Sequence, residues 1–366
     1  MHKNCYNYPI EVTDGVFDAD NPVFADTLRG ITGSDRPQAM LVADYNVVQH
    51  TAGLGSAIGR YFQENGIDLI GNPLVLSGGE KIKADNLQSA LKVVSALISA
   101  RLGTDGCVVA LGGGTVQDVA GYAAAQVRGG VKLVRVPTTY ASMSTAPFST
   151  YAAVDSVSVK DAMRVPSIPA AVVVDPAFAV TVLDGVWRAG IGESVRLALA
   201  YDASLLKKIA AAALDFRNRD EDAMRELLRE TIALAKKKGP TAMAEWSAAR
   251  LEAMSSYKLP HGYAIAIGIC IDAQYAVLSG QMKDGDFSFV RGMLSEAGAL
   301  DGAVHSRYLL ARDDEVLFGL NAWALASAGA GVTIPAGLGK TKVVDEPDRD
   351  VMREAIRTAF LGVDVR

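Results

Sequence analysis

The sequence contains little cysteine and no cysteine pattern. Only three of its 366 residues are cysteines, namely Cys5, Cys107 and Cys270. An odd number of widely spaced cysteines excludes a disulfide framework and a cysteine-based metal cluster. Cys107 and Cys270 stand in apolar runs, so we expect both in the core. This use of cysteine is typical of a reduced, cytoplasmic protein.

The sequence has no excess of basic charge, and we expect neither a leader sequence nor a membrane-spanning apolar run. The net charge is −5 without a basic stripe, which argues against nucleic acid as a partner. The first residues, MHKNCYNYPIEV, lack the apolar stretch of a signal peptide. We also expect no apolar run to reach the roughly 18 residues of a membrane span, and so no membrane partner.

Five short apolar runs are present up to about residue 178, and each ends in polar residues or glycine. They read AMLVADYN, NPLVLSGGE, CVVALGGG, KLVRVPTT and AAVVVDP, and helical stretches such as NLQSALKVVSALISARL lie between them. Continuous apolar strands that alternate with helices predict a parallel sheet covered on both faces. A chain of this length has room for two domains, and residues 1–178 are expected to form the first.

The sequence pattern changes at about residue 179, where the alternation of strands and helices ends and amphipathic or apolar helical patterns follow. HGYAIAIGICIDAQYAVLSG is apolar nearly all round and is expected to be a buried central helix. The predicted fold is an α/β N-terminal domain with a mostly parallel nucleotide-binding sheet, followed by an α-helical domain at 179–366 that would carry metal and substrate.

Three consecutive glycines follow one of the predicted strands. Gly112 to Gly114 come directly after Leu111, and Asp118 follows in a helix of small residues. Bare backbone at a helix N-terminus suits a bound phosphate, but a tight strand-to-helix turn needs the same glycines. Asp44 and the pair Thr138-Thr139 also follow strands, where ligands of parallel sheets bind. These segments could therefore converge on one crevice.

Two carboxylates and one histidine form a candidate metal site. Glu193 and His261 are both expected where a helix begins, after GIG and LP respectively, and Glu245 lies 16 residues before His261. Such a set can bind a divalent metal and leave positions open for water and substrate. The alternative is that each glutamate only stabilises a helix N-terminus.

The motifs, taken in order along the chain, resemble the dehydroquinate synthase superfamily. They are SGGEKIKADN, GGGTVQDVAGYAAA, VPTT, GIGE and HGYAIAIG. The resemblance extends from LVADYNV to IPAGLGK, nearly the whole chain, and is specific as a set. This superfamily includes the sugar-phosphate cyclases and is related to glycerol and glycerol-1-phosphate dehydrogenases. It implies a dehydroquinate synthase-like fold, a homodimer, and NAD and a divalent metal as cofactors.

The resemblance also implies roles for individual residues. The NAD-binding positions of the family fall on Asp44, Asn46, Glu80, Lys83, Gly112, Gly113, Gly114, Asp118, Thr138, Thr139 and Thr181. The glycines would cradle the pyrophosphate of NAD. The first and last metal ligands fall on Glu193 and His261, and the middle ligand, a histidine in the family, falls on Glu245. A carboxylate there favours harder metals, so manganese or cobalt should compete better with zinc.

The substrate side departs from the family pattern. Lys160 keeps a family lysine, a second lysine becomes Arg196, and Tyr151 and Thr145 stand where the family holds substrate with a lysine and an aspartate. With these cations missing, burial of an anionic substrate would cost several kcal/mol. We therefore do not expect the heptulosonate phosphate of dehydroquinate synthase as substrate.

Three functions remain open from the sequence. The first is an NAD- and metal-dependent cyclase, a carbon–oxygen lyase of the dehydroquinate synthase type that acts on a sugar phosphate or related polyol with altered specificity. The second is a metal-dependent NAD(P) polyol or polyol-phosphate dehydrogenase. The third is a nucleotide-binding homologue that has lost catalysis. Net formation of NADH separates the first two, because a cyclase recycles its cofactor.

Overall fold

The computed structural model describes residues 6–102, 106–156, 159–301, 310–327 and 329–360. The chain divides into two compact units, Met1–Val182 (unit 1) and Leu183–Arg366 (unit 2). The expected boundary at 178/179 falls four residues earlier, inside the last short helix of unit 1. Cys5 lies outside the described residues, whereas Cys107 and Cys270 are buried free thiols, as expected.

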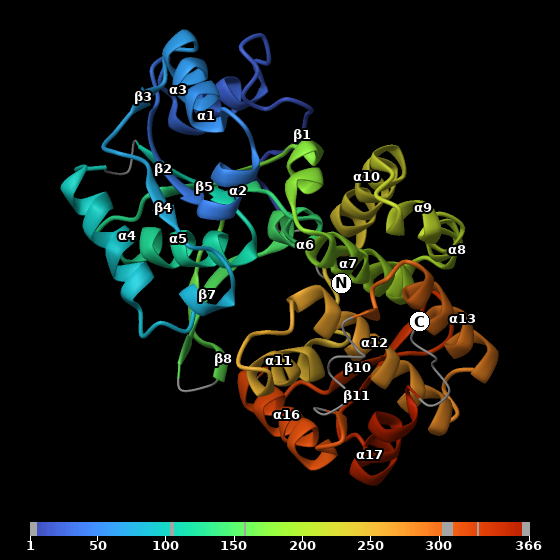
Figure 1. Ribbon diagram of the computed structural model, residues 1–366. Helices are drawn as coiled ribbons and strands as arrows, with labels where there is room; N and C mark the ends of the chain where they lie inside the picture. The colour runs from blue at the N-terminus through green and yellow to red at the C-terminus, as the bar shows by residue number, and fades with distance from the viewer. Residues whose placement is uncertain (1–5, 103–105, 157–158, 302–309, 328, 361–366) are drawn as a thin grey trace. The chain divides into compact units, whose positions relative to one another are not determined.

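Unit 1 is built around a parallel sheet (Figure 1). Its strands are β1 (Ile10–Val12), β2 (Gln38–Asp44), β3 (Asp68–Leu69), β4 (Leu74–Leu76), β5 (Cys107–Gly112), β6 (Lys132–Pro137) and β9 (Ala171–Val174). They lie in the order β1-β9-β6-β5-β2-β3, and β4 also pairs with β2. Every described pairing in this sheet is parallel. The five predicted strands are confirmed as β2, β4, β5, β6 and β9.

The helices of unit 1 cover both faces of this sheet. They are α1 (Val23–Thr32), α2 (Tyr45–His50), α3 (Leu54–Glu64), α4 (Gln88–Ser99), α5 (Gly114–Gln126) and α6 (Tyr140–Thr145), with short 3-10 turns η1 (Glu80–Ile82), η2 (Ala146–Phe148) and η3 (Pro176–Thr181). Helices α4 and α5 lie on one face and α1 and α3 on the other (Figure 1). One core cluster joins Val42 and Val108 of the sheet to Val93 of α4 and Val119 of α5.

The sequence analysis missed an antiparallel hairpin in unit 1. Strands β7 (Tyr151–Ser156) and β8 (Val159–Pro166) form a separate two-stranded sheet, and Ser156 lies opposite Val159. Arg135 of β6 fixes the start of this hairpin, because its buried guanidinium donates to the carbonyls of Ala146 and Ser149 at 2.9 and 2.8 Å. Strands with a mixed polar pattern, as in the half-exposed β8, give a weaker sequence signal than buried parallel strands.

Unit 2 is helical. Its helices are α7 (Asp184–Tyr201), α8 (Ala203–Ala211), α9 (Ala213–Arg217), α10 (Glu221–Lys238), α11 (Glu245–Met254), α12 (His261–Leu278), α13 (Asp284–Glu296), α16 (Asp313–Ala326) and α17 (Arg349–Thr358). The segment expected to be extended forms a hairpin of β10 (Val332–Pro335) and β11 (Thr341–Val344). The α/β-then-α fold class is confirmed.

Helix α12 is the central helix of unit 2, as predicted. It packs against α7, α11, α13 and α17. The expectation that no apolar segment reaches membrane-spanning length is wrong, because the 18 residues of α12 are long and apolar enough. However, 78% of that segment is buried within the protein, which is the environment of a core helix.

Candidate functional site

The strand order of unit 1 places the glycine turn at a reversal point of the sheet. Strand β2 pairs with β4 on one side and β5 on the other, and the chain then continues outward through β6 and β9. This is the order in which doubly wound sheets bind ligands at the carboxyl ends of the two strands beside the reversal. Those ends are Asp44 and Gly112.

The predicted polar residues meet at these strand ends. A Cβ on Gly112 would lie 3.1 Å from Cβ of Asp44 and 2.8 Å from Cβ of Val116, so only glycine fits there. Gly112 also pairs with Pro137, which brings Thr138 and Thr139 beside the turn. The convergence of the Asp44, glycine and Pro-Thr-Thr segments is therefore present in the structure.

The first turn of α5 offers backbone groups and space. Its N-cap, Gly113, makes no side-chain cap hydrogen bond. A Cβ on Gly114 would meet nothing within 4 Å. Thr138 is fully buried, and its hydroxyl oxygen makes no hydrogen bond among the described atoms. Exposed helix N–H groups, open space and an unsatisfied hydroxyl fit an anionic ligand such as a pyrophosphate.

Asp44 occupies a position built for a carboxylate. Its Oδ1 accepts from the backbone N–H of Asn46 at 2.8 Å and caps α2. Gly78 has φ +72°, and a Cβ there would lie 2.5 Å from both carboxylate oxygens. Burial raises the pKa of Asp44, against the opposing effect of its hydrogen bonds from the Asn46 backbone. A pocket of about 490 Å³ opens beside it, lined by Tyr45, Val75, Leu76, Ser77, Ser89 and Lys92.

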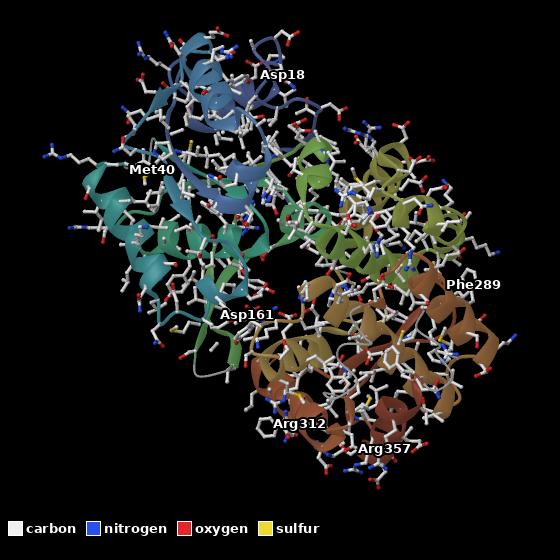
Figure 2. All side chains as sticks on the ribbon, viewed as in Figure 1. Asp18, Met40, Asp161, Phe289, Arg312 and Arg357 are labelled. Carbon is white, nitrogen blue, oxygen red and sulfur yellow. The ribbon has the colours of Figure 1, made fainter. Side chains whose placement is uncertain are left out.

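Several of the other residues predicted to bind NAD or substrate form ion pairs with one another. The Lys83 cluster consists of Glu80, Lys83, Asp118, Lys160 and Asp161. Lys83 Nζ donates to Asp118 at 2.7 Å and to Asp161 at 2.6 Å. Lys160 Nζ lies 3.8 Å from Glu80 Oε2. Figure 2 shows Asp161 on the β7–β8 hairpin.

Charge pairing decides the ionisation of the Lys83 cluster. Burial opposes the charge on Lys83, but Asp118 and Asp161 raise its pKa well above its ordinary value. Burial likewise opposes the charge on Asp161, yet Lys83 lowers the pKa of Asp161 to about 2. The lysine therefore keeps its proton and Asp161 stays ionised at neutral pH.

Three predicted residues lie elsewhere in unit 1. Tyr151 starts β7 and is 40% exposed, with the guanidinium of Arg164 stacked 4.7 Å from its ring centre. The hydroxyl of Thr145 donates to the carbonyl of Ala141 within α6. Thr181 is the last residue of η3, and its hydroxyl donates to the carbonyl of Phe178 at 2.8 Å.

In unit 2 the predicted helix start at Glu193 is wrong. Glu193 lies in the middle of α7, which begins at Asp184 and includes the glycines of GIGE. Gly192 serves contact between helices, because a Cβ there would lie 3.0 Å from the carbonyl oxygen of Gly262. A Cβ on Gly262 would overlap the carbonyl of Ala189. Close approach of α7 and α12 therefore brings Glu193 beside His261.

Glu245 and His261 do stand at helix starts, as the first residues of α11 and α12. The start of α11 is fixed by Asp272 of α12, which accepts from the Ala244 backbone at 2.7 Å and from the Trp246 indole at 2.8 Å. Burial raises the pKa of Asp272 to about 7. Asp272 is the lone charged residue in the apolar sequence of α12, and that isolation was the available signal for it.

Arg196 lies among the predicted metal ligands. The Arg196 cluster consists of Glu193, Arg196, Glu245, Glu252 and His261. The guanidinium of Arg196 donates to Glu193 Oε2 at 2.6 Å through one nitrogen and to Glu245 Oε1 through the other. Burial opposes its charge, but Glu193 and then Glu245 raise the pKa of Arg196 above its ordinary value.

The far side of Glu193 faces the histidine. Glu193 Oε1 is buried, makes no hydrogen bond among the described atoms and lies 3.4 Å from Nε2 of His261. The other ring nitrogen, Nδ1, lies 2.7 Å from Glu252 Oε1. Burial raises the pKa of Glu193, but Arg196 and His261 bring it below its usual value. Glu193 is therefore an anion at neutral pH.

Glu252 is a member of the site that the sequence analysis missed. Its side chain is fully buried, and a carboxylate behind a histidine orients the ring and fixes which nitrogen faces the site. It follows Glu245 by seven residues, two helical turns, so it projects from the same face of α11. That spacing was the signal that could have found it.

Two of the three predicted ligands fit a divalent metal directly. Glu193 Oε1 and His261 Nε2 face each other, and Glu252 holds the ring from behind. Glu245 does not face them freely, because Arg196 binds it. Accordingly, no group of three His, Cys, Asp or Glu side chains able to hold a metal ion was found in the part of the chain that the structure describes.

The fold and the turn after β5 define a doubly wound, nucleotide-type α/β unit joined to a helical unit. The family described as 3-dehydroquinate synthase N-terminal matches residues 73–188. The resemblance to the dehydroquinate synthase superfamily is thereby confirmed, and known relatives agree with it.

A 3-dehydroquinate synthase of Sulfurisphaera tokodaii is 29% identical over 230 residues, 58% of this chain and 64% of the relative. The match thus spans less than two thirds of that protein. A 2-epi-5-epi-valiolone synthase of Streptomyces glaucescens is 24% identical over 96% of this chain and 90% of the relative. The solved structure of ValA, a 2-epi-5-epi-valiolone synthase of Streptomyces hygroscopicus with NAD+ and Zn2+ bound, superposes with a TM-score of 0.83 at 19% identity, covering 96% of both chains.

Proposed function

We propose that the protein is an NAD- and metal-dependent enzyme of the sugar-phosphate cyclase type with altered substrate specificity. The observation that carries this proposal is the glycine turn at the reversal point of the sheet, with Asp44 and Thr138 beside it. The similarity to dehydroquinate and valiolone synthases supports the choice of class. We also propose a cytoplasmic homodimer, as is implied by the family resemblance and the use of cysteine.

The chain's own residues divide the binding of NAD between them. The N–H groups at the start of α5 bind the pyrophosphate, since Gly113 and Gly114 leave the approach open. Asp44 and Asn46 are the chain neighbours of Tyr45, which lines the 490 Å³ pocket, and a carboxylate at this strand end can accept from ribose hydroxyls. Thr138, Thr139 and Thr181 offer hydroxyl groups, and Glu80, Lys83 and Asp118 a fixed charge pattern. Bound NAD supplies a reversible hydride acceptor.

The residues that would hold a divalent metal are Glu193, His261 and, once it is released from Arg196, Glu245. Such a metal supplies a Lewis acid for a substrate oxygen. Glu252 keeps the imidazole of His261 oriented through Nδ1 at 2.7 Å. Arg196 keeps Glu193 ionised in its buried position, since a carboxylate there would otherwise be protonated more readily.

The substrate is a sugar phosphate or related polyol that carries less negative charge than the heptulosonate phosphate of dehydroquinate synthase. Tyr151 offers a phenol where the family pattern has a lysine, and Lys160 is already close to Glu80 at 3.8 Å. Fewer available cations favour a less anionic substrate.

A second candidate function is a polyol dehydrogenase. It is favoured by the same observation on Tyr151, because hydride transfer from an alcohol needs no cation for a leaving phosphate. The two reactions differ in their products. A cyclase returns the hydride and releases phosphate, whereas a dehydrogenase accumulates NADH.

The test is a panel of sugar phosphates and polyols incubated with purified protein, NAD and Zn2+ or Co2+. Phosphate release without NADH supports the cyclase, and NADH in proportion to product supports the dehydrogenase. We expect little or no conversion of the heptulosonate phosphate to dehydroquinate. Rapid conversion would contradict the altered specificity. A protein that binds no NAD would contradict both activities.

A further inference from the structure

Arg196 and a metal ion would need the same two carboxylate groups. One nitrogen of the guanidinium binds Glu193 and the other binds Glu245, which are two of the three candidate metal ligands. The side chain of Arg196 is only 6% exposed, so water contributes little to satisfying its charge. A cation placed between two carboxylates repels a second cation and blocks its approach to them.

Glu193 and Glu245 differ in how easily each can break its hydrogen bond with Arg196. Glu193 is 2% exposed and fixed within α7, whereas Glu245 is 34% exposed and stands at the first position of α11. Glu245, which is partly exposed and begins a helix, can change rotamer without disturbing the core. The bond between Arg196 and Glu245 is therefore the one that can open.

The charge of the cluster still favours a divalent ion. Glu193, Glu245 and Glu252 contribute three negative charges when ionised, and Arg196 contributes one positive charge. With a neutral His261, two negative charges remain uncompensated by side chains of the cluster. The guanidinium thus offsets only part of the negative charge that attracts a metal.

We propose that Arg196 is a built-in competitor for the divalent metal. Its guanidinium holds Glu245, and metal binding would require that Glu245 exchange Arg196 for the ion. Arg196 thereby sets the metal affinity of the site and allows the cluster to stay satisfied without metal. This inference rests on the metal site of the proposed function, but it concerns the competition for Glu245 and not the reaction.

The experiment measures Co2+ binding to the full-length, chelator-treated protein without NAD or substrate. Titration calorimetry gives the affinity, and the visible absorption of Co2+ reports the number of ligands. The test variant is Arg196→Met, which removes the charge and keeps much of the side-chain length. The matched control is Arg188→Met on the same helix, because Arg188 also pairs with a carboxylate, Asp301, at 3.0 Å.

We expect Arg196→Met to bind Co2+ on the order of tenfold more tightly than the parent, equivalent to removing about 1.4 kcal/mol of competition. Arg188→Met should bind as the parent does. Adding Glu245→Gln to Arg196→Met should abolish the gain, because the released ligand is then lost. The Co2+ spectrum of the parent should match that of Arg196→Met at saturation, since both end with the same ligands.

Arg196→Lys protects the test against a folding failure of the methionine variant. The lysine keeps the charge but cannot bridge both carboxylates with a planar fork, so we expect an intermediate gain. Circular dichroism before titration shows which variants are folded. If a parent that binds Co2+ is not improved by either substitution, the competition is refuted and the proposed metal site remains. If neither the parent nor any variant binds Co2+ at millimolar concentration, the metal site fails as well.

Discussion

The turn after β5 and the Arg196 cluster differ in whether their polar groups already have partners within the protein. The turn consists of bare backbone, and a Cβ on Gly114 would meet nothing within 4 Å. In the Arg196 cluster, carboxylates already have partners, as in Glu193 with Arg196 and Glu252 with His261. A ligand at the turn would add interactions, whereas a metal at the cluster would have to replace one. Backbone sites are therefore open in the free protein, and sites built of paired side chains are not.

The Lys83 cluster, like the Arg196 cluster, consists of paired charged side chains. A substitution that breaks its ion pairs should have the largest effect on the free energy of unfolding. Lys83→Met removes the buried cation, 4% exposed, that Asp118 and Asp161 share, and Asp161 keeps only its more distant contact with Arg164 at 3.4 Å. Breaking such a buried pair costs roughly 3–5 kcal/mol. Urea denaturation of the variant measures this free energy of unfolding.

The control for Lys83→Met is Arg36→Met, which removes the exposed ion pair with Asp68. Exposed pairs contribute about 0–1 kcal/mol. Equal losses in the two variants would show that the Lys83 cluster is no more than a surface ion pair in energetic terms.

A small side chain added to the open turn after β5 should strongly weaken NAD binding and hardly change the stability of the protein. Gly114→Ala adds one methyl group to open space at a helical φ, so the fold should tolerate it. NAD should no longer approach the α5 backbone closely, and the rise in melting temperature that NAD causes should be lost. Saturation at a hundred times Kd corresponds to about 2.7 kcal/mol of stabilisation.

Gly59→Ala is the matched control for Gly114→Ala, because Gly59 lies within α3 and its added Cβ would likewise meet nothing within 4 Å. It should respond to NAD as the parent does. Gly113→Asp, which adds both a side chain and a negative charge, should abolish the NAD response altogether. An unchanged response in both turn variants would place the nucleotide elsewhere.

Sequence patterns predicted the convergence of the strand ends well and the side-chain contacts of the Arg196 cluster poorly, for a physical reason. Parallel strands are buried on both faces, so their apolar runs are continuous and their ends identify the turn at Gly112. Apart from the pair of Arg196 with Glu193 three residues earlier, the ion pairs of Arg196 and Lys83 join segments far apart in the chain, such as Glu245 with Arg196. No local pattern specifies such pairs, and therefore Arg196 could be assigned only by position in a motif.

The helix assignments show the same limit. The glycines of GIGE favoured a turn before Glu193, yet they lie within α7 because Gly192 packs against α12 at a distance that no side chain would allow. Tertiary contact outweighed the low helix propensity of glycine. Glu252 and Asp272 were overlooked because a buried carboxylate has meaning only with its partners, His261 and Ala244.

The pairing in the Lys83 cluster also predicts how stability depends on pH. The pKa of Asp161 is about 2 in the folded state, below its ordinary value of 3.8. A lowered pKa contributes stability that is present above pH 3.8 and lost as the pH falls toward 2. The contribution is about 2 kcal/mol. Asp161→Asn should therefore be less stable than the parent at pH 7, and the difference should shrink in acid.

Measuring the free energy of unfolding from pH 7 to pH 2 for both proteins checks the dependence on Asp161. Asparagine suits the site because Asp161 has φ +54°, a conformation that asparagine tolerates. Asp26→Asn, in an exposed pair with Arg29, serves as the control and should change little. A stability difference that stays constant with pH would mean that Asp161 acts by packing and not by its charge.

The smallest predicted effect addresses the replacement of a histidine by Glu245. Glu245→His restores an imidazole that Arg196 does not attract, so the third ligand no longer has to be released. Imidazole also suits zinc better than a second carboxylate does. We expect Zn2+ to bind about tenfold more tightly, or about 1.4 kcal/mol, than to the parent. Competition with a chelating dye measures this affinity.

Glu245→Ala separates the two causes of the gain in Glu245→His. The alanine variant also frees Arg196 but supplies no ligand, so its Zn2+ affinity should fall below that of the parent. If alanine binds Zn2+ as tightly as histidine does, residue 245 is not a ligand, and the site consists of Glu193 and His261 alone. The Arg196–Glu245 pair would then have a structural role only.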